Sequence, residues 1–135
     1  MSVQGRTALV SGAAQGIGRA IAARLAAAGA FVALLDRDGE GVEAAAAELK
    51  GATAWVCDVR DSQEVRATVK RICSACGPID LLINNAGICP MDFSRSILRD
   101  ALETNAISPS VVTEAFAPLL LKSSSPRIIY VSSVI

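Results

Sequence analysis

The sequence predicts an α/β fold built on a doubly wound parallel sheet. The first observation is a set of five short apolar runs that are continuous rather than alternating, as is typical of strands covered on both faces. The second is a helical pattern between successive runs, bounded by glycines or by residues that favour helix N-termini. Repeated strand–helix–strand units with right-handed crossovers form a parallel sheet, so one such sheet accounts for the whole chain.

The first half of the chain supplies three strands and two helices. The strands are expected at residues 7–10, 31–35 and 53–57, and the helices at about 16–28 and 39–50. Gly29 and Gly51 follow these two helices, at the position where a left-handed residue ends a helix.

The second half continues the alternation. The third helix is expected to begin after Asp61-Ser62, which are good N-cap types, and to end before Gly77-Pro78. Strands are expected at 79–83 and 127–131. Between them, one long helix is expected from about residue 94 to residue 122, with Pro109 and Pro118 inside it.

Length and charge limit the function classes. The 135 residues suffice for one domain. The 13 Lys and Arg residues balance the 13 Asp and Glu residues, so nucleic-acid binding is not expected. No uncharged run approaches the roughly 20 apolar residues of a membrane-spanning helix. The N-terminus lacks the apolar core of a signal peptide, so the expected location is the cytoplasm.

The sequence contains four cysteines and no histidine. Cys73-Ser-Ala-Cys76 has the CxxC spacing of a redox pair or of half a zinc site, but it also fits two small buried side chains one helical turn apart. We favour the last interpretation, because a thiolate is stabilised at the start of a helix and this pair lies at an end. Cys57 and Cys89 form no second CxxC, and no metal site is expected.

A glycine-rich loop follows the first expected strand. Gly12, Gly16 and Gly18 have the spacing GxxxGxG between a strand and a helix. Glycines there permit a sharp turn and remove the Cβ atoms that would collide with a diphosphate. The following helix N-terminus offers unpaired N–H groups and a positive dipole end. The sequence therefore predicts a phosphate-binding turn, with Gly18 allowing close packing of helix on strand.

An acidic residue ends the second expected strand. Asp36 lies where a carboxylate accepts hydrogen bonds from the adenosine ribose and repels a 2′-phosphate, which favours NAD over NADP. Arg37 argues for NADP, whereas the neutral Gln15 supplies no second phosphate partner. By itself, Asp36 also fits a plain turn residue. Asp58-Val59, after the third strand, is placed either to meet the adenine or to form a loop before a helix.

The run Asn84-Asn85-Ala86-Gly87 completes a set of motifs by which the sequence resembles the short-chain dehydrogenase/reductase family. The resemblance covers essentially the whole chain. The resemblance implies a Rossmann-like fold with strand order 3-2-1-4-5. The features that carry it are Gly12, Gly16, Gly18, Asp36, Asp58, residues 84–87, Asn105 and Ser132-Ser133, in family order and spacing. Ser11 and Tyr130 depart from the family, which usually has Thr at the first position and in many members Asn at the second.

The resemblance implies a set of cofactor contacts. These fall on Gly12, Gln15, Gly16, Ile17, Gly18, Asp36, Arg37, Asp58, Val59, Asn85, Ala86 and Gly87. The ends of parallel strands lie on the ligand side of such a sheet, which suits residues 85–87. A plain Asn-rich strand end is the alternative, but it would not require Gly87.

The resemblance assigns catalytic roles to Asn105 and Ser133. Ser133 matches the serine that donates a hydrogen bond to the substrate oxygen. Asn105 matches the active-site asparagine. Pro109, four residues later, has no N–H to bond the Asn105 carbonyl, which suits a family water relay but also a helix kink without function.

The family's general acid/base is a Tyr followed four residues later by a Lys, and this pattern does not occur here. We therefore expect residues 1–135 to form a dinucleotide-binding domain that is incomplete at its C-terminal end. The expected function is NAD-dependent interconversion of a secondary alcohol and a carbonyl. The alternatives are a nucleotide-binding module without catalysis and a truncated or engineered Rossmann fragment.

The expected partners are a small alcohol or carbonyl substrate and further copies of the chain. Family members commonly form dimers or tetramers through the fourth helix. Apolar residues within 88–93 hint at a partly hydrophobic substrate, although core packing explains them equally well.

Overall fold

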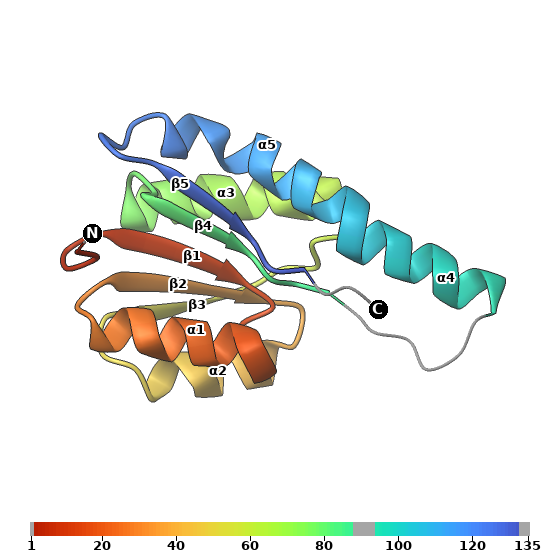
Figure 1. Ribbon diagram of the computed structural model, residues 1–135, viewed down its shortest axis with the longest axis horizontal. Helices are drawn as coiled ribbons and strands as arrows, with labels where there is room; N and C mark the ends of the chain where they lie inside the picture. The colour runs from red at the N-terminus through yellow and green to blue at the C-terminus, as the bar shows by residue number, and fades with distance from the viewer. Residues whose placement is uncertain (1, 88–93, 133–135) are drawn as a thin grey trace.

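The computed structural model describes residues 2–87 and 94–132. Within them, five parallel strands form one sheet with the order β3-β2-β1-β4-β5 (Figure 1). The strands are β1 (Thr7–Ser11), β2 (Phe31–Asp36), β3 (Ala52–Val56), β4 (Leu81–Asn84) and β5 (Arg127–Tyr130). The helical elements are α1 (Gly16–Ala27), α2 (Gly39–Ala47), α3 (Ser62–Cys76), α4 (Arg95–Leu102), η1 (Glu103–Ile107) and α5 (Ser108–Leu120). The predicted fold class and strand order are confirmed.

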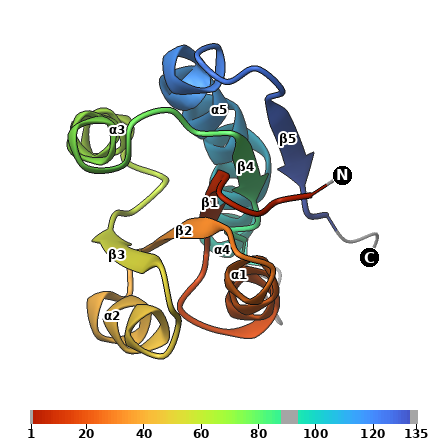
Figure 2. The same cartoon turned by 90° about the vertical axis from the view of Figure 1, so that its left-hand side faces the viewer.

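The sheet is covered on both faces. Helices α1 and α2 lie on one side, and α3 and α5 on the other (Figure 2). Side chains alternate between the faces: Val10 of β1 packs in the core beneath α1 and α2, whereas Leu9 packs with α3 and α5. Both are fully buried, as is Phe116 of α5. Burial on both faces explains why the strands are continuous apolar runs.

The order of the strands creates a crevice. The chain runs outward from β1 through β2 to β3, then returns to pair β4 with β1 on its other side. Ligands of open parallel sheets bind outside the carboxyl ends of the strands at such a reversal. Ser11, Asp36 and Asn84 end β1, β2 and β4, and therefore lie at this edge.

Side-chain caps define the starts of three helices. Asp38 accepts a hydrogen bond from the Gly41 N–H at the start of α2, and Ser94 accepts one from the Ile97 N–H at the start of α4. At α3, Asp61 accepts from the N–H groups of two residues. Helix α3 begins and ends where the sequence predicts. Helix α2 is shorter than predicted, because the chain turns after Ala47 and reaches Gly51 with a φ of 76°.

The long helix expected over about residues 94–122 is present from Arg95 to Leu120, but it is not one regular α-helix. Helix α4 passes into the π-helical turn η1 before α5 begins. The backbone N–H and the hydroxyl of Ser108 both donate to the carbonyl of Glu103, five residues earlier, which holds the wider turn. Pro109 lies at the start of α5, directly after η1, and has no N–H to donate back into the preceding turn.

Strand β5 forms an edge of the sheet. Its Ile128, Ile129 and Tyr130 side chains are about half exposed. Tyr130 nevertheless ties the strand to α5, because its hydroxyl lies 2.9 Å from Thr113 Oγ1, which also accepts a 3.0 Å hydrogen bond from Asn84 Nδ2. The tyrosine that replaces the family's asparagine thus joins β5, α5 and β4. Across residues 2–87 and 94–132, no helix is both long and apolar enough to span a bilayer.

Candidate functional site

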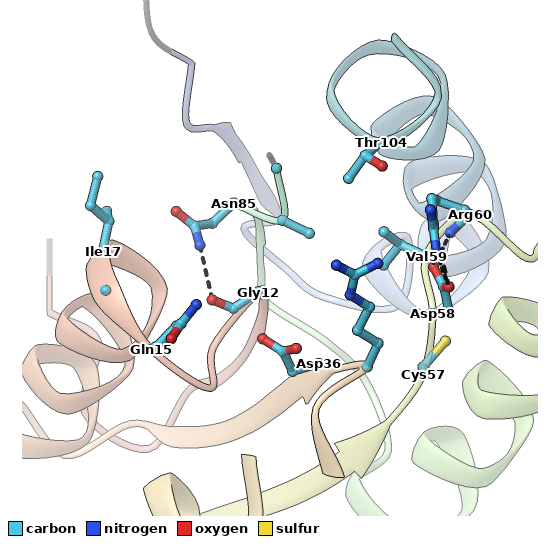
Figure 3. A pocket seen from close by; sticks show the side chains of 14 residues that line it. Gly12, Gln15, Ile17, Asp36, Cys57, Asp58, Val59, Arg60, Asn85 and Thr104 are labelled. Atoms are coloured by element: carbon cyan, nitrogen blue, oxygen red, sulfur yellow. Dashed lines mark hydrogen bonds and ion pairs between the residues drawn. The ribbon is translucent and has the colours of Figure 1, made fainter. Parts of the chain in front are cut away.

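A cleft of about 360 Å³ opens at the carboxyl ends of the strands (Figure 3). Its volume falls in the range of roughly 300–1,000 Å³ that is usual for small-molecule sites. The cleft is lined by Gly12, Gln15, Gly16, Ile17, Asp36, Arg37, Cys57, Asp58, Val59, Arg60, Asn85, Ala86, Gly87 and Thr104. Every residue predicted to contact a cofactor lines this cleft except Gly18. The fold thus brings residues from the ends of four strands to one place.

The glycine loop adopts a backbone that other residues rarely take. Gly12 and Gly16 have φ values of 66° and 59°. A Cβ at Gly12 would lie 2.8 Å from the Ala86 Cα, so this position must stay without a side chain. A Cβ at Gly16 would meet no atom of the described residues within 4 Å. The space beside Gly16 is therefore free for a ligand to approach the backbone.

Gly18 supports the cleft from behind. A Cβ at this position would lie 2.1 Å from the carbonyl oxygen of Gly12 and 2.4 Å from Asn85 Nδ2. The glycine therefore lets α1 pack directly on the loop that precedes it. The sequence-based role of Gly18 in close helix-to-strand packing agrees with this geometry.

The N-terminus of α1 differs from the other helix starts that follow a loop in the described residues. Its N-cap residue, Gln15, makes no side-chain hydrogen bond to the helix, and the first turn contains no acidic residue. The corresponding starts of α2, α3 and α4 are all capped by side chains. The first N–H groups of α1 and its positive dipole end are thus left for an anion in the cleft.

A compact hydrogen-bond cluster holds the Asn-rich strand end against the glycine loop. The hydroxyl of Ser11 accepts bonds from the N–H groups of Asn85 (3.0 Å) and Ala86 (3.1 Å). The Asn85 amide donates in turn to the carbonyl of Gly12 (Figure 3) and to that of Ser11, at 3.2 Å each. Serine therefore braces this turn with its hydroxyl, as expected where the family usually has threonine.

Asp36 is held in place at the base of the cleft. Its Oδ2 accepts a hydrogen bond from the Ala14 N–H and its Oδ1 accepts one from the Asp38 N–H, each at 3.0 Å. A carboxylate has about four lone-pair sites, so two remain for hydroxyl groups of a ligand. Arg37 also lines the cleft and brings a positive charge beside this carboxylate.

Asp58 is paired with Arg60. The guanidinium Nη2 lies 2.9 Å from Asp58 Oδ2, and Nε lies 3.1 Å and 3.3 Å from the two oxygens. The hydrogen bond from Arg60 is the main reason why the pKa of Asp58 lies below its ordinary value, although partial burial opposes the shift. Asp58 lines the cleft and also organises the loop before α3.

The turn η1 brings two residues to the other side of the cleft. A Cβ at Gly87 would lie 3.1 Å from Asn105 Oδ1, so glycine leaves room for this amide. Thr104 reaches the cleft from above (Figure 3). Among the described residues, its buried hydroxyl has no hydrogen-bond partner. Ser133 and the proposed substrate segment 88–93 lie outside the described residues.

Burial affects two of the described cysteines, Cys57 and Cys76. Burial raises the pKa of Cys57 to about 11 and also raises the pKa of Cys76. Both side chains are therefore neutral thiols near pH 7. Cys89 lies outside the described residues. Within the described part of the chain, no group of three or more Cys, Asp or Glu side chains is arranged to hold a metal.

Sequence reasoning missed three residues that line the cleft: Cys57, Arg60 and Thr104. A signal existed for two of them. Arg60 lies two residues after Asp58 in the loop that follows a buried strand, and Thr104 directly precedes Asn105. Neither spacing is specific enough to indicate a ligand site without the structure.

The fold and the cleft first define a class: a doubly wound parallel sheet with a glycine loop at its crevice is typical of dinucleotide-binding proteins. Residues 6–135 match the short chain dehydrogenase family, and the chain belongs to this family. The resemblance inferred from the motifs is thereby confirmed.

The chain is also similar to individual dehydrogenases and oxidoreductases. Oxidoreductase UcpA from Salmonella typhimurium strain LT2 is 41% identical over 138 residues, covering 96% of this chain and 52% of that protein. D-threitol dehydrogenase from Mycolicibacterium smegmatis is 35% identical over 139 residues, covering 97% and 54%. The chain spans about half the length of these curated relatives.

A solved structure shares the whole arrangement. The crystal structure of a metagenomic short-chain oxidoreductase in complex with NADP matches with a TM-score of 0.89 at 32% identity. The match covers 100% of this chain and 65% of that one. Family and fold thus agree between sequence and structure.

Proposed function

We propose that the chain binds a nicotinamide adenine dinucleotide, NAD in preference to NADP, as the cofactor-binding part of an oxidoreductase. The main observation in support is that one cleft is bordered by the open glycine loop, the uncapped start of α1 and the carboxylate of Asp36. The reaction proposed is the interconversion of a secondary alcohol and a carbonyl. The bound cofactor supplies the hydride chemistry.

The residues fit the parts of the cofactor in order along the cleft. The backbone from Gly12 to Gly18 and the start of α1 would hold the diphosphate, because they offer N–H donors without obstructing side chains. Asp36 would accept from the adenosine ribose hydroxyls. Asp58 and Val59 would border the adenine, and residues 85–87 the nicotinamide half.

The preference for NAD rests on charge. The Asp36 carboxylate repels a 2′-phosphate, whereas Arg37 beside it attracts one. We expect the carboxylate to dominate, because both of its oxygens are held by backbone N–H groups at the base of the cleft.

Calorimetric titration of the chain with NADH and NADPH tests this proposal. NADH is expected to bind about tenfold or more tightly, the range in which one charged contact changes affinity. Tighter binding of NADPH would reverse the cofactor assignment. No binding of either nucleotide would overturn the proposed function.

Catalytic roles are proposed for Asn105 and Ser133. Ser133 would donate a hydrogen bond to the substrate oxygen and stabilise charge on it. Asn105 lies beside Gly87, close to the expected nicotinamide end of the cleft. Two relatives carry names of oxidoreductases, one of them acting on D-threitol, which supports an alcohol or polyol as the substrate class.

A nucleotide-binding module without catalysis remains the second candidate. The observation in its favour is that the glycine loop, the start of α1 and Asp36 account for nucleotide binding without any catalytic group. NADH formation, followed at 340 nm with secondary alcohols and polyols including D-threitol, separates the two. Turnover supports the oxidoreductase, whereas NADH binding without turnover supports the module.

Self-association is part of the proposal. Leu98, Leu102 and Ile107 expose apolar side chains along α4 and η1. Such a row of apolar residues suits a contact between copies of the chain, as a homodimer or homotetramer. Light scattering coupled to gel filtration measures the state, and a monomer at all concentrations argues against it.

A further inference from the structure

The pairing of Arg60 with Asp58 changes what this end of the cleft offers to a ligand. Three donors of Arg60 reach the two carboxylate oxygens: the backbone N–H, at 3.0 Å from Oδ1, and the side-chain Nε and Nη2. Both side chains are about one-third exposed and line the cleft. The carboxylate is therefore neutralised and largely occupied by its own loop.

Further contacts keep this loop in place. The Asp58 N–H donates to Glu64 Oε1 at 3.1 Å, and the Asp58 carbonyl accepts from the Asp61 N–H at 3.1 Å. Asp100 of α4 and Glu103 of η1 also interact electrostatically with Arg60. The guanidinium is thus attracted by Asp58 in its own loop and by acidic groups of α4 and η1.

We propose that Arg60 determines which purine base the nucleotide site prefers. This proposal rests on the proposed function. By occupying the Asp58 carboxylate, Arg60 removes the acceptor that would select the 6-amino group of adenine. Arg60 also places guanidinium N–H donors at this end of the cleft. The site therefore accepts a 6-oxopurine nucleotide about as well as the adenine nucleotide.

Adenine and hypoxanthine differ in the group that each presents at position 6 of the purine ring. Adenine presents an amino donor at position 6, which a free carboxylate accepts, whereas hypoxanthine presents a carbonyl oxygen there, which a free carboxylate repels. Arginine has five N–H donors and no acceptor. It pairs well with the O6 and N7 acceptors of a 6-oxopurine. Exchange of Arg60 for a short neutral residue would free the carboxylate and restore selection for adenine.

The test compares NADH with reduced nicotinamide hypoxanthine dinucleotide by calorimetric titration of the full chain. For the native chain, the two dissociation constants are expected to lie within about threefold of each other. For Arg60→Thr, the preference for NADH is expected to rise to about tenfold or more, the scale of one hydrogen bond to a charged group. Arg60→Lys, which keeps the charge but not the two-point pairing, is expected to lie between.

Controls separate base recognition from general damage. Arg66→Thr removes the same charge from an exposed position on α3 and is expected to leave the ratio unchanged. Reduced nicotinamide mononucleotide, which has no purine, is expected to bind the native chain and Arg60→Thr equally. A ratio that Arg60→Thr leaves within about twofold of the native value overturns this inference. If no dinucleotide binds, the proposed function itself fails and the inference with it.

Discussion

Residues with no side chain shape the cleft as much as those that carry charge. Gly16 leaves an open approach to the backbone, whereas Gly12 and Gly18 stand where any Cβ would strike a neighbouring loop. The first glycine makes room for a ligand, and the other two make room for the protein itself. The same motif therefore serves both binding and packing.

Gly18→Ala tests the packing role. Its Cβ would meet the backbone carbonyl of Gly12 at 2.1 Å, so the loop must move. We expect a loss of about 1–3 kcal/mol in the free energy of unfolding, the usual cost of overpacking, and weaker NADH binding. Chemical denaturation and calorimetry measure the two effects.

Gly39→Ala is the matched control for this substitution. It also lies at a helix start, but its Cβ would meet only methyl carbons of Val56, the nearer at 3.3 Å. We expect a much smaller change in stability. Equal effects of the two substitutions would show that the contact with Gly12 has no special weight.

At the scale of single elements, capping decides where helices begin. Asp61 accepts hydrogen bonds from the Gln63 N–H (3.0 Å) and the Glu64 N–H (3.1 Å), and α3 starts directly after it. Asp61→Ala leaves both N–H groups without this partner. The expected loss is about 1 kcal/mol in the free energy of unfolding, measured by urea denaturation.

Asp61→Asn is the control for the cap, because asparagine caps a helix about as well as aspartate. It is expected to retain most of the stability of the native chain. An asparagine variant as unstable as the alanine variant would assign the effect to the charge rather than to the cap.

Local sequence patterns predict some of the helices and strands but not all of their details. Apolar runs and caps place the strands and α3 correctly, because burial and capping act on neighbouring residues. The same patterns predict the long helix but not its change to a wider turn at residues 103–107. The wider turn there depends on Ser108 donating twice to the Glu103 carbonyl, and nothing in the local helical pattern distinguishes this choice.

At the scale of the whole molecule, Asp80 ties the end of the sheet opposite the cleft. Its carboxylate accepts from the Thr7 N–H at 2.8 Å and from the Ser123 hydroxyl at 2.5 Å. Its backbone bonds to Thr7 of β1 and to Arg127 of β5. Three strands and a loop therefore converge on one residue.

The free energy of unfolding is expected to fall at acidic pH, when the carboxylate of Asp80 becomes protonated. Burial alone would raise its pKa, but the bonds from Ser123 and Thr7, together with the nearby Arg6, lower it. A lowered native pKa adds stability above the unfolded pKa of about 3.9, and this stability is lost as the pH falls through the native pKa.

Asp80→Asn tests this dependence. The variant is expected to lose about 1–3 kcal/mol of stability at pH 7, because a bond to a charged acceptor is weakened. Below about pH 4 the difference from the native chain should narrow. Urea denaturation at several pH values measures both. The exposed Glu43→Gln on α2 serves as the control, and a constant difference across pH would contradict the role given to the charge.

The sequence by itself determined the alternation of strands and helices, the parallel sheet and the positions of the glycine loop and Asp36. These features follow from hydrophobic periodicity and from the backbone freedom of glycine, which are properties of short segments. Only the tertiary structure decided that Arg60 holds Asp58 and that Thr104 lines the same cleft. The first depends on the conformation of one loop and the second on the packing of elements far apart in the chain, and no local pattern encodes either.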